Sequence, residues 1–369
     1  MVVKLEAMTK HNFRLLDIYT DYLLSSFGAT TATGLSRLLP ELSHDQITRF
    51  LSQQPLTDRD LWKIVKPQVR AVQSEEAVLI IDDSVEEKPY TDESELITWH
   101  YDHCQGRTVK GINLLSALYY SGSVSLPVAF ELIQKTVLST DAKTGRDKWV
   151  APQTKNELAR QMIGAVARKQ IPFGYVLADL WFSSSENMAF IKHKARKEFI
   201  FPLKSNRRVA LSEGDKKRGR WKSLSSLDLA PGACVELHLE GVPFAVVVSR
   251  QLFKNEEGTE GSLVLCSSDL SLSASSLFAI YHKRWKVEEY HKSLKSHAAL
   301  AKSPTKTPHT QQNHIFASIV AFLKLESYRT QTHLNHFALK AKLYHGAIQA
   351  AFAQLQELKA RHPQVAITT

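Results

Sequence analysis

The sequence predicts a mixed α/β fold, and three observations support that prediction. Apolar runs of strand length recur through the middle of the chain and alternate there with amphipathic stretches. Two of these runs end in a carboxylate, at Asp82 and Asp179. The flanking regions, residues 1–75 and 301–369, show helical periodicity instead. A central sheet with helical regions at both ends of the chain accounts for all three observations.

The central elements follow one another in a definite order. The patterns predict three strands at residues 78–81, 112–120 and 124–130, followed by a helix at residues 156–168 and a strand at residues 174–178. A second helix at residues 184–197 and a last strand at residues 199–201 complete the order. Gly122 and its serine neighbours predict a hairpin between the second and third strands. This order is typical of the ribonuclease H-like fold, a mixed sheet with helices on both faces.

The pattern changes again after the last of these strands. Apolar and polar residues alternate in a region that predicts an all-β insertion, and from Ser273 onward the periodicity is helical. We therefore expect a helical N-terminal domain that could bind DNA at residues 1–75, and a ribonuclease H-like catalytic core in two pieces at residues 76–204 and 271–300. A β-strand insertion at residues 205–270 separates the two pieces, and a helical C-terminal region follows at residues 301–369.

The N-terminal region has two interpretations. Short helices are predicted at residues 33–39 and 43–52, with Pro40 in the joint. Ser43 and Gln46 form a capping-box pattern at the start of the second helix. Two short helices around a tight joint are typical of a DNA-reading helix-turn-helix and also of a plain helical bundle. Because this region is nearly neutral, both interpretations stay open.

Composition excludes several classes of protein. Hydrophobic residues make up 43% of the chain, which is enough to bury a core and excludes a mainly disordered state. The apolar stretch at residues 315–323 is too short to span a bilayer, and residues 1–12 lack the apolar segment of a secretory signal. Three widely spaced cysteines exclude a disulfide framework. We expect a cytoplasmic protein with no membrane partner.

The charge indicates an anionic partner. Lys and Arg number 47 against 37 Asp and Glu, so the net charge is +10. Most of the surplus lies in residues 192–222, where twelve basic residues face three acidic ones. Trp221 interleaves with these cations, as in proteins that bind nucleic acid, although a solvated loop is the alternative. The DNA contacts that we expect from this segment are Lys204, Arg207, Arg208 and Trp221.

Three carboxylates suit a shared metal site. Asp82 and Asp179 end apolar strands, where side chains project into the crevice that binds ligands in α/β sheets, and Glu288 lies on the helix after the insertion. Such carboxylates can hold two Mg²⁺ ions about 4 Å apart, which activate a water and stabilise the leaving oxygen in phosphodiester cleavage. Each aspartate could instead cap the following turn. Asp83 remains an alternative to Asp82, because neighbours on a strand point to opposite faces.

Four polar residues share one face of the predicted helix after the insertion. Tyr281, Arg284, Glu288 and Lys295 fall within about 60° of one another at 100° per residue. The carboxylate can bind metal, and the phenol and the two cations can hold a DNA phosphate beside it. A surface helix with an Arg284–Glu288 salt bridge is the alternative.

Residues 281–295 resemble the Y-R-E-K signature of bacterial insertion-sequence DDE transposases of the "insertion sequence four" type. The contexts Ile81-Asp82 and Ala178-Asp179 resemble the first two acidic motifs of that family. The resemblance implies an enzyme that acts as a homodimer on double-stranded DNA in the bacterial nucleoid. Such enzymes cut at the terminal inverted repeats of a transposon and join the ends to target DNA, with two Mg²⁺ or Mn²⁺ ions.

The resemblance also implies roles for individual residues. By position, the catalytic and metal-binding triad would be Asp82, Asp179 and Glu288. Tyr281, Arg284 and Lys295 would hold the terminal phosphate, and Trp221 would stack on a flipped base. Two alternatives remain: a ribonuclease H-like nuclease without strand transfer, and a catalytically inactive DNA-binding protein descended from a transposase.

Overall fold

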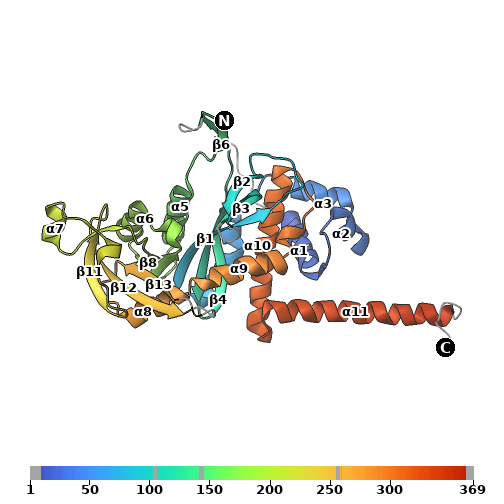
Figure 1. Cartoon of the computed structure of the whole chain (residues 1–369). Coiled ribbons are helices and arrows are strands. Elements are labelled where there is room, and N and C mark those ends of the chain that lie inside the picture. The colour runs from blue at the N-terminus through green and yellow to red at the C-terminus, as the bar shows by residue number, and fades with distance from the viewer. Residues whose placement is uncertain (1–9, 103–105, 141–144, 255–257, 259, 363–369) are drawn as a thin grey trace. The chain divides into compact units, whose positions relative to one another are not determined.

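The computed structural model describes residues 10–102, 106–140, 145–254, 258 and 260–362, so Cys104 lies outside the described residues. The chain divides into two compact units, one made of residues 1–55 with 292–369 and the other of residues 56–291. We call them the helical unit and the sheet unit. In Figure 1 the blue and red ends of the chain belong to the helical unit, and the middle of the colour range forms the sheet unit.

The N-terminal and C-terminal helices pack together in the helical unit. Its main helices are α1 (Lys10–Ser25), α2 (Ala32–Leu38), α3 (His44–Leu51), α10 (Pro308–Thr332) and α11 (His336–Arg361). Contacts join α1, α3 and α10, and α2 packs against α3. The predicted capping box is confirmed, because Ser43 and Gln46 exchange side-chain and backbone hydrogen bonds at the start of α3. The two short N-terminal helices are therefore part of a larger bundle.

The two long C-terminal helices differ in burial. In α10 the apolar stretch at residues 315–323 is wholly buried, which explains its composition as a core segment. Most of α11 is exposed instead. Within the described part of the chain, no helix combines the length and the apolar character that crossing a bilayer requires.

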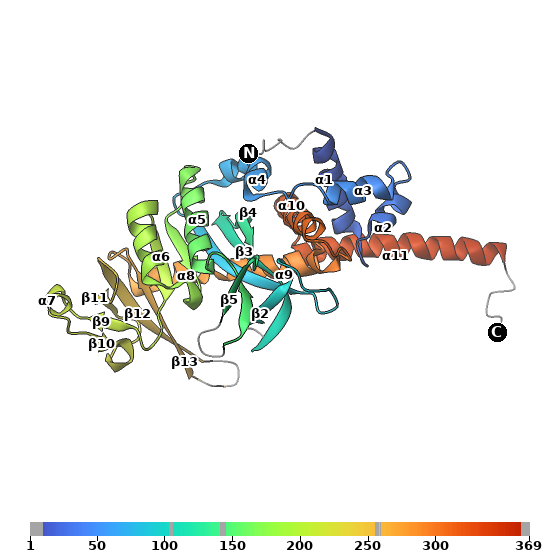
Figure 2. The same ribbon diagram turned by 90° about the horizontal axis from the view of Figure 1, so that it is seen from above.

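One mixed sheet of eleven strands organises the sheet unit (Figure 2). Its order is β10-β9-β11-β12-β13-β8-β7-β1-β3-β2, and β4 also pairs with β3. Strands β7 and β8 run parallel to β1 and to each other, whereas β3 is antiparallel to β1. The strands are β1 (Val78–Glu87), β2 (Thr98–Asp102), β3 (Arg107–Ser121), β4 (Val124–Leu132), β7 (Tyr175–Ala178), β8 (Glu198–Pro202), β9 (Arg208–Ala210), β10 (Lys222–Ser223), β11 (Cys234–Leu239), β12 (Ala245–Lys254) and β13 (Glu260–Ser267).

The predicted core elements follow one another in the predicted order, but three strands that were not predicted lie between them, namely β2 and the small strands β5 (Val137–Thr140) and β6 (Asp147–Val150). Helix α5 (Lys155–Arg168) leads into β7, and α6 (Ser185–Phe190) with the turn η2 (Ile191–Ala195) leads into β8. Helices α5 and α6 lie side by side, as Figures 1 and 2 both show, and α4 (Asp58–Val72) packs against β4. The result is an α/β fold with a mixed sheet and with helices at both ends of the chain, which is compatible with a ribonuclease H-like fold.

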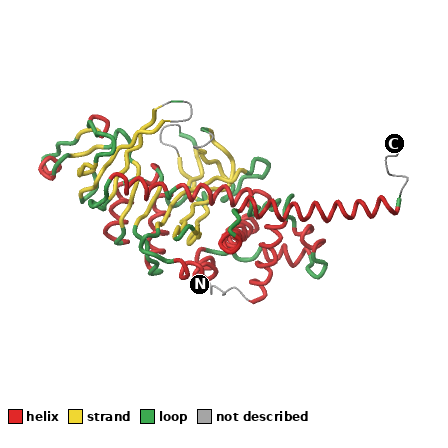
Figure 3. The backbone as a smooth tube through the Cα atoms, turned by 90° about the horizontal axis from the view of Figure 1, so that it is seen from below, coloured by secondary structure: helices red, strands yellow, loops and turns green. Residues whose placement is uncertain are grey.

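The region expected to be an all-β insertion continues the main sheet. Strand β13 pairs antiparallel with β8, and β12, β11, β9 and β10 extend the sheet outward from it. The region is not purely β, because the short helix α7 (Glu213–Lys217) lies between β9 and β10. Figure 3 shows these strands in yellow as part of one run of strands.

The helix that was expected to carry the four signature residues is broken. Helix α8 (Ala274–His282) ends before Arg284, and α9 (Trp285–Ser296) begins after it. The amide of Arg284 bonds to the carbonyl of Tyr281, and the amide of Val287 bonds to the carbonyl of Arg284. These bonds span three residues instead of four, which tightens the chain into a turn. The prediction of one continuous helix is therefore wrong at the position of Arg284.

Candidate functional site

Two aspartates lie where two neighbouring parallel strands stop pairing. Strand β1 continues beyond Asp82 to Glu87, so the expectation that Asp82 ends its strand is wrong, whereas Asp179 directly follows β7. In the register of β1 and β7, Ile81 is the partner of Ala178, and the next residues are Asp82 and Asp179. Because parallel strands lie about 4.8 Å apart and run in the same direction, both carboxylates leave the sheet at adjacent positions of one edge. The strands themselves are buried apolar segments, so the carboxylates sit on a rigid support.

The surroundings of Asp82 and Asp179 favour the protonated form of each carboxyl group. Burial, followed by the charges of Asp179 and Asp83, raises the pKa of Asp82 to about 7. Burial also raises the pKa of Asp179, with a further contribution from Asp83. Arg284 lowers both pKa values without cancelling these effects. Two partly buried carboxylates that repel each other and share one cation are a donor set suited to a divalent metal ion.

Asp83 belongs to a different cluster from Asp82. Its carboxylate pairs with Lys155 of α5 at 2.9 Å and accepts a hydrogen bond from Asn113 of β3 at 2.8 Å. Asp82 instead lies 3.9 Å from the guanidinium of Arg284. Neighbouring residues of a strand point to opposite faces, so the two aspartates serve opposite faces of the sheet. Asp83 therefore forms its ion pair with Lys155, and Asp82 faces Asp179 and Arg284.

Arg284 connects two of the predicted triad residues. Its Nη2 donates to Glu288 Oε1 at 2.7 Å, and its Nη1 lies 3.9 Å from Asp82 Oδ2. Only 14% of the Arg284 side chain is exposed, against 42% for Glu288. The break between α8 and α9 gives Arg284 this position, because its backbone lies in the turn. The predicted salt bridge between Arg284 and Glu288 is present, and it is part of the carboxylate cluster.

Tyr281 completes the inner part of the site. Its hydroxyl donates to the carbonyl of Ala178, the residue before Asp179, across 3.4 Å, which is a long hydrogen bond. The guanidinium of Arg284 lies over its ring, 5.9 Å from the centroid. Burial raises the pKa of Tyr281 to about 12. The phenol therefore keeps its proton at neutral pH and can donate it to an anionic ligand.

Glu288 and Lys295 are gathered less closely with the two aspartates than Tyr281 and Arg284 are. Among the residues that the structure describes, no group of three or more His, Cys, Asp or Glu side chains is arranged to hold a metal ion. Glu288 is occupied by its bond to Arg284. Lys295 lies on α9 seven residues after Glu288, which is about two turns further on the same helix face.

The basic candidates lie at different distances from the carboxylates. Lys204 is exposed and follows β8, so it lies at the carboxylate edge of the sheet, two strands from β1. Arg207 donates to Ser185 Oγ at 2.6 Å, and Arg208 pairs with Glu240 at 3.3 Å. Trp221 precedes the edge strand β10, and seven strand spacings from β10 to β1 amount to roughly 34 Å. The structure therefore does not bring Trp221 together with the carboxylates.

Sequence analysis missed the residues that surround Asp83. Lys155 pairs with this aspartate and lies over the ring of Trp181, 5.1 Å from its centroid. Trp181 in turn donates its backbone amide to Asp179 at 2.9 Å, so Asp179 also caps the turn after β7, the alternative role considered above. The capping box of Thr154 and Glu157 at the start of α5 was a usable signal, because it fixes Lys155 as the first residue of that helix.

Comparison with known proteins agrees with this arrangement. No curated protein matches the chain. A family model described as "DDE superfamily endonuclease" matches residues 5–227, which is more than half of the chain. The matched segment contains Asp82 and Asp179, whereas Glu288 lies beyond its end. With this match, and with two partly buried aspartates side by side where β1 and β7 stop pairing, the chain belongs to the DDE superfamily endonuclease family.

Proposed function

We propose that this DDE superfamily endonuclease is a DNA transposase of the "insertion sequence four" type. It cuts DNA at the terminal inverted repeats of its own element and joins the freed ends to target DNA as a homodimer. The observation that supports the proposal best is the placement of Asp82 and Asp179 next to the last paired residues of β1 and β7, with Tyr281 and Arg284 of the signature beside them.

The carboxylates would hold the divalent metal. Asp82, Asp179 and Glu288 are the proposed ligands, and oxygen donors of this kind suit Mg²⁺ and Mn²⁺. When bound, two such ions lower the pKa of a water and neutralise charge on the phosphate under attack. Because Arg284 already neutralises Glu288 and lies close to Asp82, the guanidinium and the metal compete for the same carboxylates.

The signature residues would bind the DNA end. Arg284 offers a planar pair of donors to phosphate oxygens, and Tyr281 offers a protonated phenol at neutral pH. Lys295 adds a positive charge on the face of α9 that carries Glu288. In the cutting step a water oxygen attacks the phosphorus, and the 3′ oxygen of the flanking or element strand leaves with a proton. In the joining step the 3′ hydroxyl of the element loses its proton and attacks a phosphorus of the target, and the 3′ oxygen of the target strand leaves with a proton.

The surface around the edge of the sheet that holds Asp82 and Asp179 would bind the rest of the DNA. Lys204 is the basic candidate that lies nearest along the sheet, and Arg208 and Trp221 lie several strands further out. One turn of B-form DNA is about 34 Å long, so a duplex that enters at the carboxylates reaches both regions. We propose that the outer strands bind the duplex of the terminal repeat.

The direct test uses DNA that flanks the gene. Purified protein is incubated with Mg²⁺ or Mn²⁺, a fragment that carries the flanking inverted repeats and a supercoiled target plasmid. A transposase produces breaks at the repeat ends and covalent joining of those ends to the plasmid. Breaks without joining would establish the nuclease alternative. Binding of the repeats without any break would establish the inactive DNA-binding alternative.

A further inference from the structure

A backbone amide holds one oxygen of each of the two proposed metal-binding aspartates. The amide of Asp83 donates to Asp82 Oδ1 at 2.9 Å, and the amide of Trp181 donates to Asp179 Oδ1 at 2.9 Å. Each bond limits the rotation of its carboxylate, so the direction of the other oxygen depends on where Asp83 and Trp181 lie. Whatever fixes these two residues therefore affects the geometry that a metal ion would meet.

The side chain of Lys155 contacts both of these residues. Its ammonium donates to Asp83 Oδ1 at 3.0 Å and to Oδ2 at 2.9 Å, and it lies over the ring of Trp181, 5.1 Å from the centroid. Asp83 belongs to β1, and Trp181 belongs to the turn η1 (Leu180–Phe182) that follows β7. One ammonium from α5 therefore joins the strand that carries Asp82 to the turn that follows Asp179.

Stability alone is a weak explanation for this ion pair. The side chains of Lys155 and Asp83 are 23% and 16% exposed, so the loss of their hydration offsets much of their attraction. A pair of this kind can fix one geometry while it adds little to the free energy of unfolding. Trp181 is 50% exposed, so burial holds its ring less firmly than it holds a core residue, and the cation over the ring adds a directional contact.

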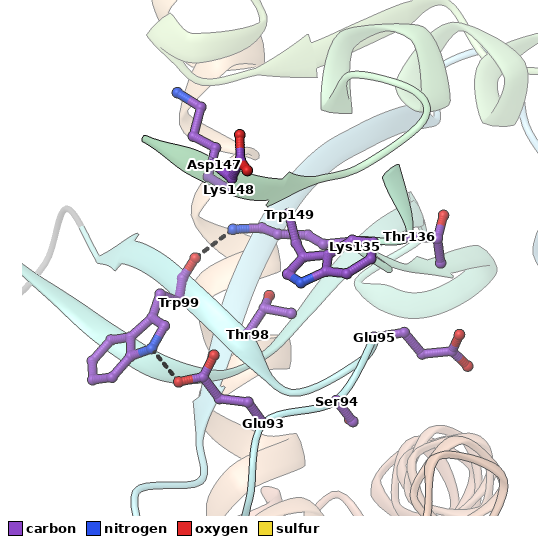
Figure 4. Close-up of a pocket in the computed structure, with 10 residues that line it drawn as sticks. All are labelled: Glu93, Ser94, Glu95, Thr98, Trp99, Lys135, Thr136, Asp147, Lys148 and Trp149. Carbon is purple, nitrogen blue, oxygen red and sulfur yellow. Dashed lines mark hydrogen bonds between the residues drawn. The ribbon is translucent and has the colours of Figure 1, made fainter. Parts of the chain in front are cut away.

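Other lysines of this region lie at a separate cavity of about 790 Å³ beside β5 and β6 (Figure 4). The charged residues that line this cavity are Lys135, Lys148, Glu93, Glu95 and Asp147. Lys135 donates to the carbonyl of Trp99 at 2.5 Å, so its ammonium is directed toward β2. Carboxylates accompany the lysines there, and Lys155 does not line the cavity. The contacts of Lys155 with β1 and with the turn after β7 are therefore a separate arrangement.

We propose that Lys155 is a positioning residue for the metal site. It holds Asp83 and Trp181 in place and so fixes the two amides that orient the carboxylates of Asp82 and Asp179. Lys155 acts through these neighbours and is not itself a ligand. The inference rests on the proposed function, because it takes Asp82 and Asp179 as metal ligands.

The test measures the affinity for Mn²⁺ in the absence of DNA, from the rise in melting temperature with Mn²⁺ concentration at pH 8. Lys155→Met keeps a long side chain but removes the ammonium. Loss of a residue that orients metal ligands typically weakens metal binding about 10–100-fold, so the Kd for Mn²⁺ should rise about tenfold or more. Lys155→Arg should restore most of the affinity, because a guanidinium can pair with Asp83 and stack on Trp181.

Two further variants test the contacts of Lys155 one at a time. Trp181→Leu keeps the amide that holds Asp179 but removes the ring under the cation, so it should weaken Mn²⁺ binding in the same direction as Lys155→Met. Asp83→Asn keeps an oxygen that can accept from Lys155, so its affinity for Mn²⁺ should stay close to that of the wild type. Wild-type affinity in both Lys155→Met and Trp181→Leu would overturn the proposal.

Lys169→Met is the matched control. Lys169 caps the other end of α5, lies over the ring of Trp62 at 4.8 Å from the centroid and donates to the carbonyl of Val128 at 3.0 Å. Its loss should lower the melting temperature of the metal-free protein and leave the affinity for Mn²⁺ unchanged. Equal losses of affinity in Lys155→Met and Lys169→Met would make the effect one of general stability and overturn the proposal.

Asp179→Asn separates this inference from the proposed function. It should remove most of the rise in melting temperature that Mn²⁺ causes. A rise that persists in Asp179→Asn would overturn the metal assignment and this inference with it. Normal Mn²⁺ affinity in Lys155→Met, together with loss of the rise in Asp179→Asn, would overturn the role of Lys155 alone.

Discussion

Asp82 and Asp179 follow two residues, Ile81 and Ala178, that are partners in neighbouring parallel strands. This register brings two like charges together at a buried edge, which costs folding free energy while no metal neutralises them. The arrangement therefore predicts how the stability and the activity of the protein depend on pH, on metal and on substitution of each charged neighbour.

The choice between Asp82 and Asp83 can be tested by a matched pair of amide variants. Asp82→Asn should lose at least a thousandfold of cleavage activity, because the amide cannot replace a metal-binding carboxylate. Asp83→Asn removes only the partner of Lys155, so we expect cleavage within about tenfold of the wild type. Both variants should bind duplex DNA normally. Normal cleavage by Asp82→Asn together with an inactive Asp83→Asn would reverse the assignment.

Stability should fall as pH rises in the absence of metal. The folded-state pKa of Asp82 is raised to about 7, so the folded protein keeps a proton there that the unfolded chain loses near pH 4. The stabilisation is fully present below about pH 4 and is lost as the pH rises to about 7. Melting temperatures measured in EDTA across this window should decline more in the wild type than in Asp82→Asn. Equal pH profiles would show that Asp82 ionises normally.

Metal should reverse that loss of stability. A divalent ion binds the deprotonated carboxylates, so the rise in melting temperature caused by Mn²⁺ should grow between pH 6 and 8. The rise should be small in Asp179→Asn, which lacks one ligand, and unchanged in Asp83→Asn. A rise that does not depend on pH, or that survives in Asp179→Asn, would place the metal elsewhere.

Arg284 should have two separable effects. A lost charge-assisted bond to phosphate costs about 1.5–3 kcal/mol, so Arg284→Ala should cut DNA ends roughly ten- to a hundredfold more slowly. Because Arg284 also lowers the pKa of Asp82, its loss should move the rise of activity with pH to higher values. Arg284→Lys should restore the pH profile better than the rate, since lysine supplies the charge without the paired donors. A purely structural role predicts lower melting temperature with an unchanged pH profile.

Lys295 can be tested against a second lysine on the same helix. Lys295→Ala should reduce strand transfer from pre-cut ends about tenfold or more, because the proposed contact is to the terminal phosphate. Lys286 pairs with Glu289 at 2.8 Å on the same helix, so Lys286→Ala should leave strand transfer unchanged. Equal activity of both variants would remove Lys295 from the DNA site.

The exposed cations of the outer strands should contribute to duplex binding. Lys217 and Lys222 are exposed, and each phosphate contact adds about 0.9 to the slope of log affinity against log salt. Replacing both lysines with Gln should therefore flatten the slope by up to about two units in filter binding. The control is Arg59→Gln with Lys66→Gln, two exposed cations of α4. The same slope in both double variants would make the basic segment a solvated surface.

The core of this site was predictable because an apolar run followed by an aspartate is a strong pattern, although β1 itself continues past Asp82 to Glu87. Apolar runs that end in Asp82 and Asp179 are visible in the sequence, and the fold places such residues at one edge. The turn at Arg284 was not predictable, because Lys283 and Arg284 are good helix formers and tertiary contacts to two carboxylates override that preference. The sheet of β5 and β6 was missed because its strands have four residues each and are mostly exposed.

The region between β8 and β13 extends the sheet outward and returns beside β8, where it pairs through β13. The amide of Leu203 bonds to the carbonyl of Val264 at 2.9 Å, so both ends of this excursion are already neighbours. A short turn could join them without shifting the register of β8 or the position of Asp179. In evolutionary terms the geometry of this join lets the excursion change in length without moving Asp82 and Asp179.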